Sequence, residues 1–392
     1  MLPIKIKLPD SFFNEEERCN YIITTQTKRL WAILLDLLCE FDRVCKKNHL
    51  IYSLDSGTLL GAIRHKGFIP WDNDIDVIMH RTEFEKLCKI ASDEFVAPYF
   101  WQTNDTDPGS ARRHAQLRNC ATTGILRDEM EGNVPLYSFN QGIFIDIFIL
   151  DEVPDDSDLQ KRHSCELALH IPILWELKHL LYTNNREPWI RDALTHECQR
   201  YDSIASQYNG KGYNRVANIT LIPIRKESTL FPKELFYDLI ECEFEGFRFP
   251  CPRESETILT GYYGDWHKYV VNNGDHGELL IDIEKPYTEY ISQQQTKGYN
   301  KNEIHPLALL FQQRNLAWDE CKKNREDYRI LEQNYKNIQE EIRSLKEENI
   351  QTKNILCNYK EKYEKQKEEN ILIRNSIYWK ITRPLRYIFG YK

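Results

Sequence analysis

The chain has 392 residues, of which 41% are hydrophobic and 12% aromatic, enough to build a substantial core and to argue against global disorder. Because one core rarely grows beyond roughly 250–300 residues, we expect one large folded domain with an additional segment. The 52 basic and 60 acidic side chains leave a formal charge of −8, so bulk charge does not indicate a nucleic-acid partner.

The first elements are a long helix, a short strand and a turn. Apolar residues at helical spacing predict a helix over 14–49, with Asn14 as its N-cap and acidic residues suited to the positive end of the helix dipole. A short strand over 50–54 follows. The turn Ser56-Gly57-Thr58 then leads from that strand into a second helix.

Strands and helices then alternate along the chain. Polar residues 285–306 lack periodicity, and we expect them to end the globular part and begin a linker. Residues 156–210 are mainly helical in pattern, and 214–250 are mixed, with a helix beginning at 231. The other predicted elements are strands at 75–79, 99–102, 115–118, 122–126 and 143–150, and helices at 81–95 and 254–263.

Three acids, Asp72, Asp74 and Asp76, precede or begin a predicted strand. Because side chains alternate along a strand, Asp74 and Asp76 should point to one side. Two such carboxylates need compensating charge, and their oxygen ligands suit Mg²⁺ or Mn²⁺. A solvated acidic loop is the alternative, since acid triplets are common on protein surfaces.

The turn at Ser56-Gly57-Thr58 favours the metal site over the acidic loop. Backbone amides at a helix N-terminus attract phosphate, and Gly57 allows close approach of the backbone. Arg64, beside His65, could hold a phosphate oxygen with its guanidinium fork. A phosphate-binding turn followed by a strand with paired acids is typical of metal-dependent phosphoryl or nucleotidyl transferases.

Asp146 interrupts an apolar strand, Phe144-Ile145-Asp146-Ile147-Phe148. An acid inside such a strand is costly unless it has a partner. A neighbouring strand that carries Asp74 and Asp76, with a shared metal ion, would supply one. The alternative is an acid that faces solvent on an edge strand.

Residues 53–77, SLDSGTLLGAIRHKGFIPWDNDIDV, resemble the signature of the LicD and fukutin-related family of phosphotransferases. That signature has a GTLLG stretch, an RHKGFIPWD stretch and a D-x-D pair. The likeness covers about residues 30–270. Its shorter pieces follow in the expected order: Cys45-Lys46-Lys47-Asn48, Leu117-Arg118-Asn119 with Thr122 or Thr123, Phe144-Ile145-Asp146-Ile147-Phe148, Phe244-Glu245-Gly246 and Tyr262-Tyr263-Gly264-Asp265-Trp266.

The resemblance implies an α+β, nucleotidyltransferase-like fold related to the polymerase-β superfamily, with a mixed sheet flanked by helices. It also implies transfer of an alcohol phosphate, such as phosphocholine, onto a glycan hydroxyl. The donor would be CDP-choline, CDP-ribitol or CDP-glycerol, and CMP would leave. We expect a bacterial capsule, lipopolysaccharide or teichoic acid setting from the same resemblance.

The residues take roles within that chemistry. Asp74, Asp76 and Asp146 would hold Mg²⁺, with Asp72 as a ligand or helper, and the metal would neutralise charge on the phosphate and leaving group. Asp146 is the candidate to take the proton of the acceptor hydroxyl. The predicted substrate-binding residues are Ser56, Gly57, Thr58, Arg64, His65, Arg118 and Tyr263.

Two other functions fit parts of the pattern. A glycosyltransferase with a D-x-D metal site also uses a nucleotide donor, but it usually has a longer nucleotide-binding segment ahead of the acid pair. A non-catalytic scaffold carried by a coiled coil is the other alternative, although retention of all four acids argues against it.

The C-terminal part differs in composition from the rest. Residues 321–373 lack Gly and Pro and place mostly apolar or aromatic residues at the a and d positions of seven heptads, which predicts a coiled coil and a homo-oligomer. A lone charged helix folded against its own domain is the alternative. The tail, 374–392, mixes aromatic and basic residues without acids, which suits a membrane interface or a docking segment. We therefore predict a catalytic domain over 1–300 and a linker over 301–320.

Two patterns bear on location. The eleven cysteines include no CxxC pair, which fits a reducing cytosol rather than a disulfide framework. The first residues lack an apolar signal region and no run of 18 apolar residues occurs. We expect a cytoplasmic protein, with peripheral contact at the inner face of the cytoplasmic membrane.

Overall fold

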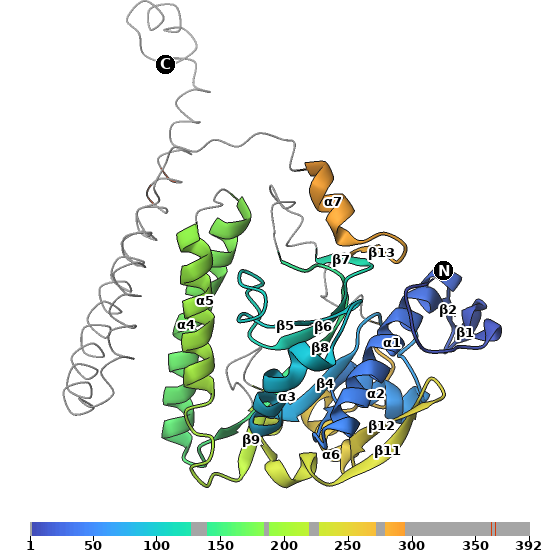
Figure 1. Ribbon diagram of the computed structural model, residues 1–392. Helices are drawn as coiled ribbons and strands as arrows, with labels where there is room; N and C mark the ends of the chain where they lie inside the picture. The colour runs from blue at the N-terminus through green and yellow to red at the C-terminus, as the bar shows by residue number, and fades with distance from the viewer. Residues whose placement is uncertain are drawn as a thin grey trace, which may run out of the picture. The chain divides into compact units, whose positions relative to one another are not determined.

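The computed structural model describes residues 2–126, 139–183, 188–218, 227–271 and 279–294, with Lys362 and Lys365 as isolated positions (Figure 1). Backbone contacts divide the chain into two units, Met1–Asn315 and Leu316–Lys392, and every element below belongs to the first. Apart from those two lysines, the predicted linker, coiled coil and tail lie outside the described residues.

The first long helix is shorter than the predicted 14–49 helix. Thr24, not Asn14, caps it, because the Thr24 hydroxyl accepts a backbone N–H of the first turn at 3.1 Å. Glu16, one of the acids expected at the positive end of the helix dipole, lies in a strand before the helix and accepts a hydrogen bond from Lys28 Nζ at 2.7 Å. This N-terminal part consists of β1 (Glu16–Arg18), β2 (Tyr21–Ile23) and α1 (Thr25–Lys47).

A seven-stranded mixed sheet lies at the centre of the described residues. Its main path is β10-β9-β8-β4-β3, and β6 pairs with both β8 and β5. β4 runs parallel to β8, whereas β6 and β9 run antiparallel to it. The strands are β3 (Ser53–Leu54), β4 (Asp76–His80), β5 (Tyr99–Gln102), β6 (Ala115–Asn119), β8 (Ile143–Val153), β9 (Arg215–Asn218) and β10 (Phe231–Pro232).

One edge of β8 is interrupted. β4 occupies the other edge, so β6 and β9 follow each other along this one. β6 pairs with β8 as far as Ile147, and β9 pairs with it from Leu150 onward. Phe148 and Ile149 therefore lie between the two partner strands, and this gap borders the candidate site described below.

Helices and three two-stranded sheets, β1-β2, β11-β12 and β13-β7, surround the central sheet (Figure 1). α1 contacts β8 and β6, α3 contacts β4 and β8, and α2 lies among β4, β11 and α6. No helix in the described ranges is both long and apolar enough to span a membrane. The remaining elements are α2 (Ser56–His65), α3 (Arg81–Glu94), β7 (Thr123–Leu126), α4 (Ser157–Thr183), α5 (Pro188–Ala205), β11 (Leu239–Phe244), β12 (Phe247–Pro252), α6 (Ser255–Tyr263), β13 (Leu279–Asp282) and α7 (Tyr287–Gln294).

Two predicted segments differ in the structure. The helix expected from 231 is replaced by β10 and a single 3₁₀ turn, because Phe231 is buried and pairs with Val216 of β9. The polar segment expected to end the domain begins instead with α7. The hydroxyl of Tyr290 in α7 donates to Asp282 at 2.8 Å, a contact that no local periodicity reveals.

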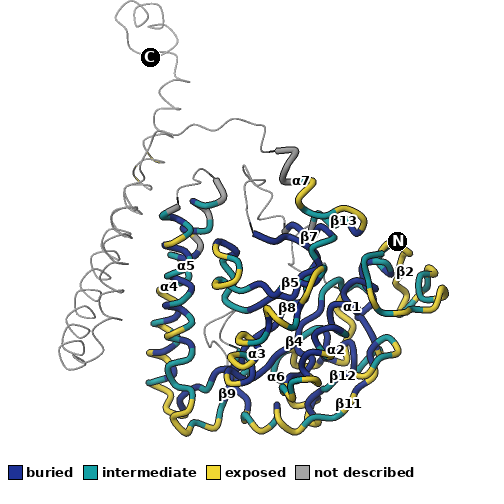
Figure 2. The backbone as a smooth tube through the Cα atoms, viewed as in Figure 1, coloured by how far each residue is buried: buried dark blue, intermediate teal, exposed yellow. Residues whose placement is uncertain are grey.

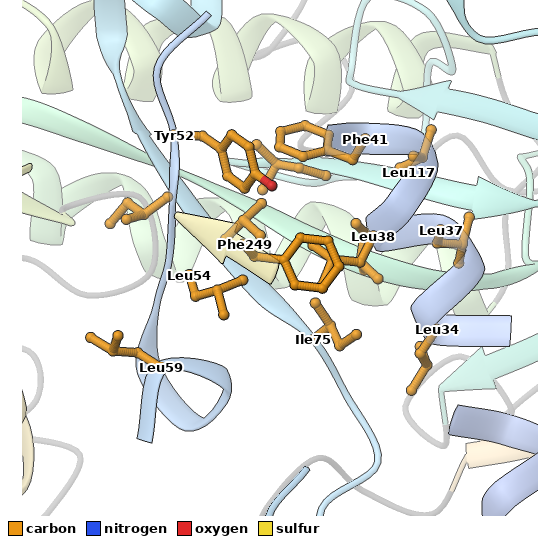
Figure 3. Packing of buried hydrophobic residues seen from close by; sticks show 14 of the residues in the cluster. Leu34, Leu37, Leu38, Phe41, Tyr52, Leu54, Leu59, Ile75, Leu117 and Phe249 are labelled. Atoms are coloured by element: carbon orange, nitrogen blue, oxygen red, sulfur yellow. The ribbon is translucent and has the colours of Figure 1, made fainter. Parts of the chain in front are cut away.

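The main hydrophobic core packs the buried side chains of α1 against residues of the neighbouring strands and loops. Figure 3 shows Leu34, Leu38 and Phe41 of α1 in one cluster with Phe249 of β12 and with Ile75, which directly precedes β4. Along this region the chain is mostly buried, as Figure 2 shows. Burying each large apolar side chain contributes about 1.5–3 kcal/mol, so this core fixes the strands that carry the acids.

A second, smaller core holds α4 against α5. An ion-pair network links this pair to the sheet. Arg81 of α3 donates to both oxygens of buried Asp151 on β8, at 2.8 and 2.7 Å, and to Asp202 of α5 at 2.6 Å. Three elements that are distant in sequence therefore meet at one guanidinium.

Candidate active site

The parallel pairing of β4 and β8 brings two of the predicted acids together. Asp76 begins β4, and its register partner on β8 is Asp146. The backbone N–H of Asp146 donates to the carbonyl of Ile75 at 2.9 Å, which fixes the two strands at this point. Acids that are 70 positions apart in the sequence thus lie side by side.

Asp55 is a further acid at this position, and the sequence reasoning missed it. Its backbone N–H donates to the Asp76 carbonyl at 3.0 Å, and its side chain is fully buried. The Ser56 and Tyr262 hydroxyls donate to its two oxygens at 3.0 and 3.2 Å. Burial raises the pKa of Asp55 to about 6, although these hydrogen bonds lower it. An acid directly before the Ser56-Gly57-Thr58 turn was the available signal.

The predicted phosphate-binding turn forms the first turn of α2. Ser56 has a φ of 49°, a left-handed conformation that is strained for a serine. The Thr58 hydroxyl accepts the Asp76 backbone N–H at 2.8 Å and so ties α2 to β4. A Cβ atom at Gly57 would lie 2.9 Å from Asp72 Oδ2, so the carboxylate of Asp72 rests on the N-terminal turn of this helix. That position attracts anions.

Asp76 is surrounded by other acidic side chains. Burial raises its pKa well above the ordinary value, and the negative charges of Asp74, Asp146, Asp55 and Asp72 raise it further. Five carboxyl groups therefore interact around one strand end. Such a cluster is stabilised by a cation or by a proton.

Asp146 has the opposite environment. Burial by itself would raise its pKa, but the charge and hydrogen bond of His114, the hydrogen bond of Gln116 and the charge of Arg112 hold it below the ordinary value. His114 Nε2 lies 2.9 Å and Gln116 Nε2 lies 2.7 Å from the same oxygen, Oδ1. The sequence reasoning missed both partners. Gln116 faces Asp146 only through the β6–β8 register.

Arg118 is fully buried in the sheet. Its predicted contact with the donor stays a prediction. Arg118 donates to the Gln102 side chain at 2.5 Å, to the Gly142 carbonyl at 2.7 Å and to the Gln116 side-chain oxygen. Because Gln116 in turn donates to Asp146, Arg118 positions the amide that holds Asp146.

Arg64 and His65 end α2 and contact the segment that follows α6. Arg64 donates to the carbonyls of Trp266 and Lys268 at 2.7 and 3.2 Å, and its guanidinium lies 4.9 Å from the centre of the Tyr269 ring. Burial, with the charges of Arg64 and Arg18, lowers the pKa of His65 to about 4, so its imidazole is neutral. Phosphate binding by these two residues stays a prediction.

Tyr263 lies near the acids. Burial raises the pKa of its hydroxyl, and the charges of Asp55 and Asp76 add to the effect.

The loop between α2 and β4 is held by Glu245, which accepts hydrogen bonds from Arg18 at 2.5 and 3.1 Å and from the Phe68 backbone at 3.2 Å. Glu245 of the Phe244-Glu245-Gly246 sequence therefore stabilises the loop that leads to the acids of β4.

The residues present fit a divalent cation, although they do not form a complete protein cage. Across the described residues, no three His, Cys, Asp or Glu side chains converge so that they could hold a metal ion. Mg²⁺, however, is commonly bound through one or two carboxylates, with waters and substrate phosphates as the other ligands. Asp76 and Asp146 provide two such carboxylates, and a cation beside them would reduce the repulsion between Asp76 and its acidic neighbours.

The close approach at Gly57 gives a test of Asp72. We expect Gly57→Ala to lower turnover by roughly 10-fold, because the new methyl group displaces the Asp72 carboxylate from the α2 N-terminus. The melting temperature should change little, since the displaced atom is the end of a flexible side chain. Turnover and thermal unfolding of the same preparation check this. Equal turnover in both proteins would exclude a role for the present position of Asp72.

The part of the chain that carries this site is similar to known proteins. The family model described as LicD/FKTN/FKRP, nucleotidyltransferase domain, matches residues 49–119, which include α2 and β4. The Lipopolysaccharide cholinephosphotransferase LicD of Haemophilus influenzae is 30% identical over 260 residues, covering 60% of this chain and 89% of that protein. Protein RP689 of Rickettsia prowazekii is 29% identical over 123 residues, covering 31% of this chain and 40% of the relative.

Proposed function

Because the chain belongs to the LicD family, we propose that it is a metal-dependent phosphotransferase that moves an alcohol phosphate from a CDP-linked donor onto a hydroxyl of a cell-surface glycan. The observation that carries the proposal is the pairing of Asp76 with Asp146 inside a cluster of acids. The name of the Haemophilus relative supports phosphocholine as the first group to test and lipopolysaccharide as the first acceptor.

The metal site would use Asp76 and Asp146, with Asp74 as a third ligand and Asp72 at the helix N-terminus. Bound Mg²⁺ or Mn²⁺ would supply charge neutralisation at the phosphates and the leaving group. The hydrogen bonds of His114 and Gln116 both fall on Oδ1 of Asp146 and fix the orientation of its carboxylate. Oδ2 is then the oxygen that would face the substrate.

The reaction would be an in-line displacement. A new bond forms between the acceptor oxygen and the phosphorus that carries the alcohol, and the phosphoanhydride bond to CMP breaks. CMP leaves with the electron pair of that bond, and the acceptor proton passes to Asp146. The lowered pKa of Asp146 keeps it ionised and able to accept that proton at neutral pH.

Further parts of the proposal rest on sequence patterns. We include a nucleotidyltransferase-like fold, which the description of the matching family model supports. The heptads of 321–373 and the basic-aromatic residues of 374–392 support a homo-oligomer with peripheral contact at the inner face of the cytoplasmic membrane.

The test is a donor panel. CDP-choline, CDP-ribitol and CDP-glycerol are each incubated with the full chain, deacylated lipopolysaccharide and MgCl₂, and CMP release and product mass are measured. We expect a product that has gained an alcohol phosphate. Transfer of a sugar without phosphate from a nucleotide-sugar would indicate the glycosyltransferase, and the absence of any donor turnover would favour the scaffold.

Metal removal gives a direct prediction. EDTA should lower CMP release by at least about 10³-fold, because the charge on the phosphates and leaving group is no longer neutralised. Excess Mg²⁺ or Mn²⁺ should restore it. Turnover that persists after exhaustive chelation would contradict metal dependence while leaving phosphotransfer open to the product-mass assay.

A further inference from the structure

A pocket lies beside the interrupted edge of β8. Its volume is about 260 Å³, and it is lined by Ile149 of β8, Phe84 of α3 and Asp202 of α5, with the segment before β6 as a further wall. Ile149 is one of the two β8 residues between the partner strands β6 and β9. The break in strand pairing therefore leaves room here for a small ligand.

The lining of this pocket carries both signs of charge. Arg112 and Arg113 provide guanidinium groups, and Asp105 and Asp202 provide carboxylates. Asp202 also accepts a hydrogen bond from Arg81, which is outside the lining. Hydroxyl groups both donate and accept hydrogen bonds, so a ligand with several hydroxyls can use both kinds of side chain. Trp101 adds an aromatic surface to the lining.

Two nitrogen atoms at the pocket have unused hydrogen-bonding capacity. Nη1 of Arg113 and Nδ1 of His114 are buried and have no hydrogen-bond partner in the structure, and the His114 side chain is only 10% exposed. Buried polar atoms are nearly always satisfied by protein, water or ligand. Because neither atom is exposed, a ligand hydroxyl would reach them only after the two side chains turn toward the pocket.

His114 connects the pocket to the acids. Its side chain lines the pocket, and its Nε2 lies 2.9 Å from Asp146 Oδ1. One imidazole ring therefore separates the pocket from the proposed proton acceptor. A sugar unit held in the pocket would therefore extend past His114 to bring a hydroxyl to Asp146 Oδ2.

We propose that this pocket binds a sugar unit of the glycan acceptor and presents its hydroxyl on the Asp146 side of the site. The assignment of the sugar to the acceptor rests on the proposed function. A polyol carried by the donor, such as ribitol or glycerol, has the same chemistry and is the other source. The position beside Asp146 favours the acceptor.

The test fills the pocket from an exposed position. Ser203 lies on α5, is exposed and lines the pocket, so Ser203→Phe adds a plug without removing a buried interaction. Cys165→Phe, at an exposed residue of α4 that is not part of the lining, is the matched control. Ser203→Leu is a smaller plug that gives a second variant if the phenylalanine lowers the yield of folded protein.

Binding is measured first, without turnover. Saturation-transfer NMR uses the full chain with the methyl glycosides of glucose, galactose and N-acetylglucosamine, and with free ribitol and glycerol. We expect at least one glycoside to bind to the parent chain and to Cys165→Phe, with the signal lost in Ser203→Phe. No glycoside signal, or a signal that both variants keep, overturns the proposal.

Kinetics then separate the two sources of hydroxyl groups. We expect Ser203→Phe to raise the KM for the acceptor at least about 10-fold more than the KM for CDP-choline. A rise confined to the KM of CDP-ribitol or CDP-glycerol assigns the pocket to the donor and overturns the acceptor proposal. If the parent chain releases no CMP from any donor, the proposed function fails, and the NMR result alone decides whether the pocket binds sugars.

Discussion

Asp76→Asn should abolish phosphotransfer while making the protein more stable. Turnover is expected to fall by at least about 10³-fold, because the substitution removes a charged oxygen from the site that would hold the metal. Stability should rise because Asp76 is buried among Asp74, Asp146, Asp55 and Asp72, and the neutral amide ends that repulsion. CMP release and calorimetric unfolding of the same samples provide both measurements.

The pH dependence of that gain follows from the direction of the pKa shift. The pKa of Asp76 is raised in the folded state, so the wild-type chain loses stability as pH rises above the ordinary carboxyl range, and the Asn variant does not. In EDTA, the difference in melting temperature should therefore be small near pH 4 and larger at pH 7. Asp93→Asn, at an exposed position of α3, is the matched control and should change neither quantity. A destabilised Asp76→Asn chain would contradict this electrostatic account.

The sequence was sufficient to predict the acids because their pattern is local. A charged residue in an apolar strand, as at Asp146, and acids at alternate positions before a strand are visible within a few residues. The strand boundaries around them were also predicted closely, since β4, β5, β6 and β8 have strong apolar patterns. The sequence also predicted that these two strands are neighbours, whereas their parallel direction and the Asp76–Asp146 register come from the structure.

The partners of the acids could not be predicted in the same way. His114 and Gln116 reach Asp146 through the register of β6 against β8, and Tyr262 reaches Asp55 from α6. No periodicity in one segment specifies such contacts between distant segments. The predicted N-terminal end of α1 was wrong for a related reason. Glu16 lies in a strand and pairs with a lysine of that helix, which is a contact between separate elements.

Arg118→Met separates a positioning role from donor binding. Three buried acceptors would lose their donor, and each costs about 1–3 kcal/mol when left unpaired, so the free energy of unfolding should fall by about 3–9 kcal/mol. The kcat should fall roughly 10-fold, because the Gln116 amide is no longer fixed toward Asp146, while the KM for the donor stays nearly constant. Denaturant unfolding and steady-state kinetics measure these quantities.

Two further variants sharpen this result. Arg118→Lys should recover little of the lost stability, because an ammonium group cannot reproduce the planar fork that reaches the side chains of Gln102 and Gln116 together with a backbone carbonyl. Arg248→Met, at an exposed position of β12, removes the same chemical group from the surface and should leave both stability and kinetics unchanged. If Arg118→Met instead raised the donor KM and kept the wild-type stability, Arg118 would bind the donor directly. We expect the positioning role, because the guanidinium of Arg118 is buried and already donates hydrogen bonds to acceptors inside the sheet.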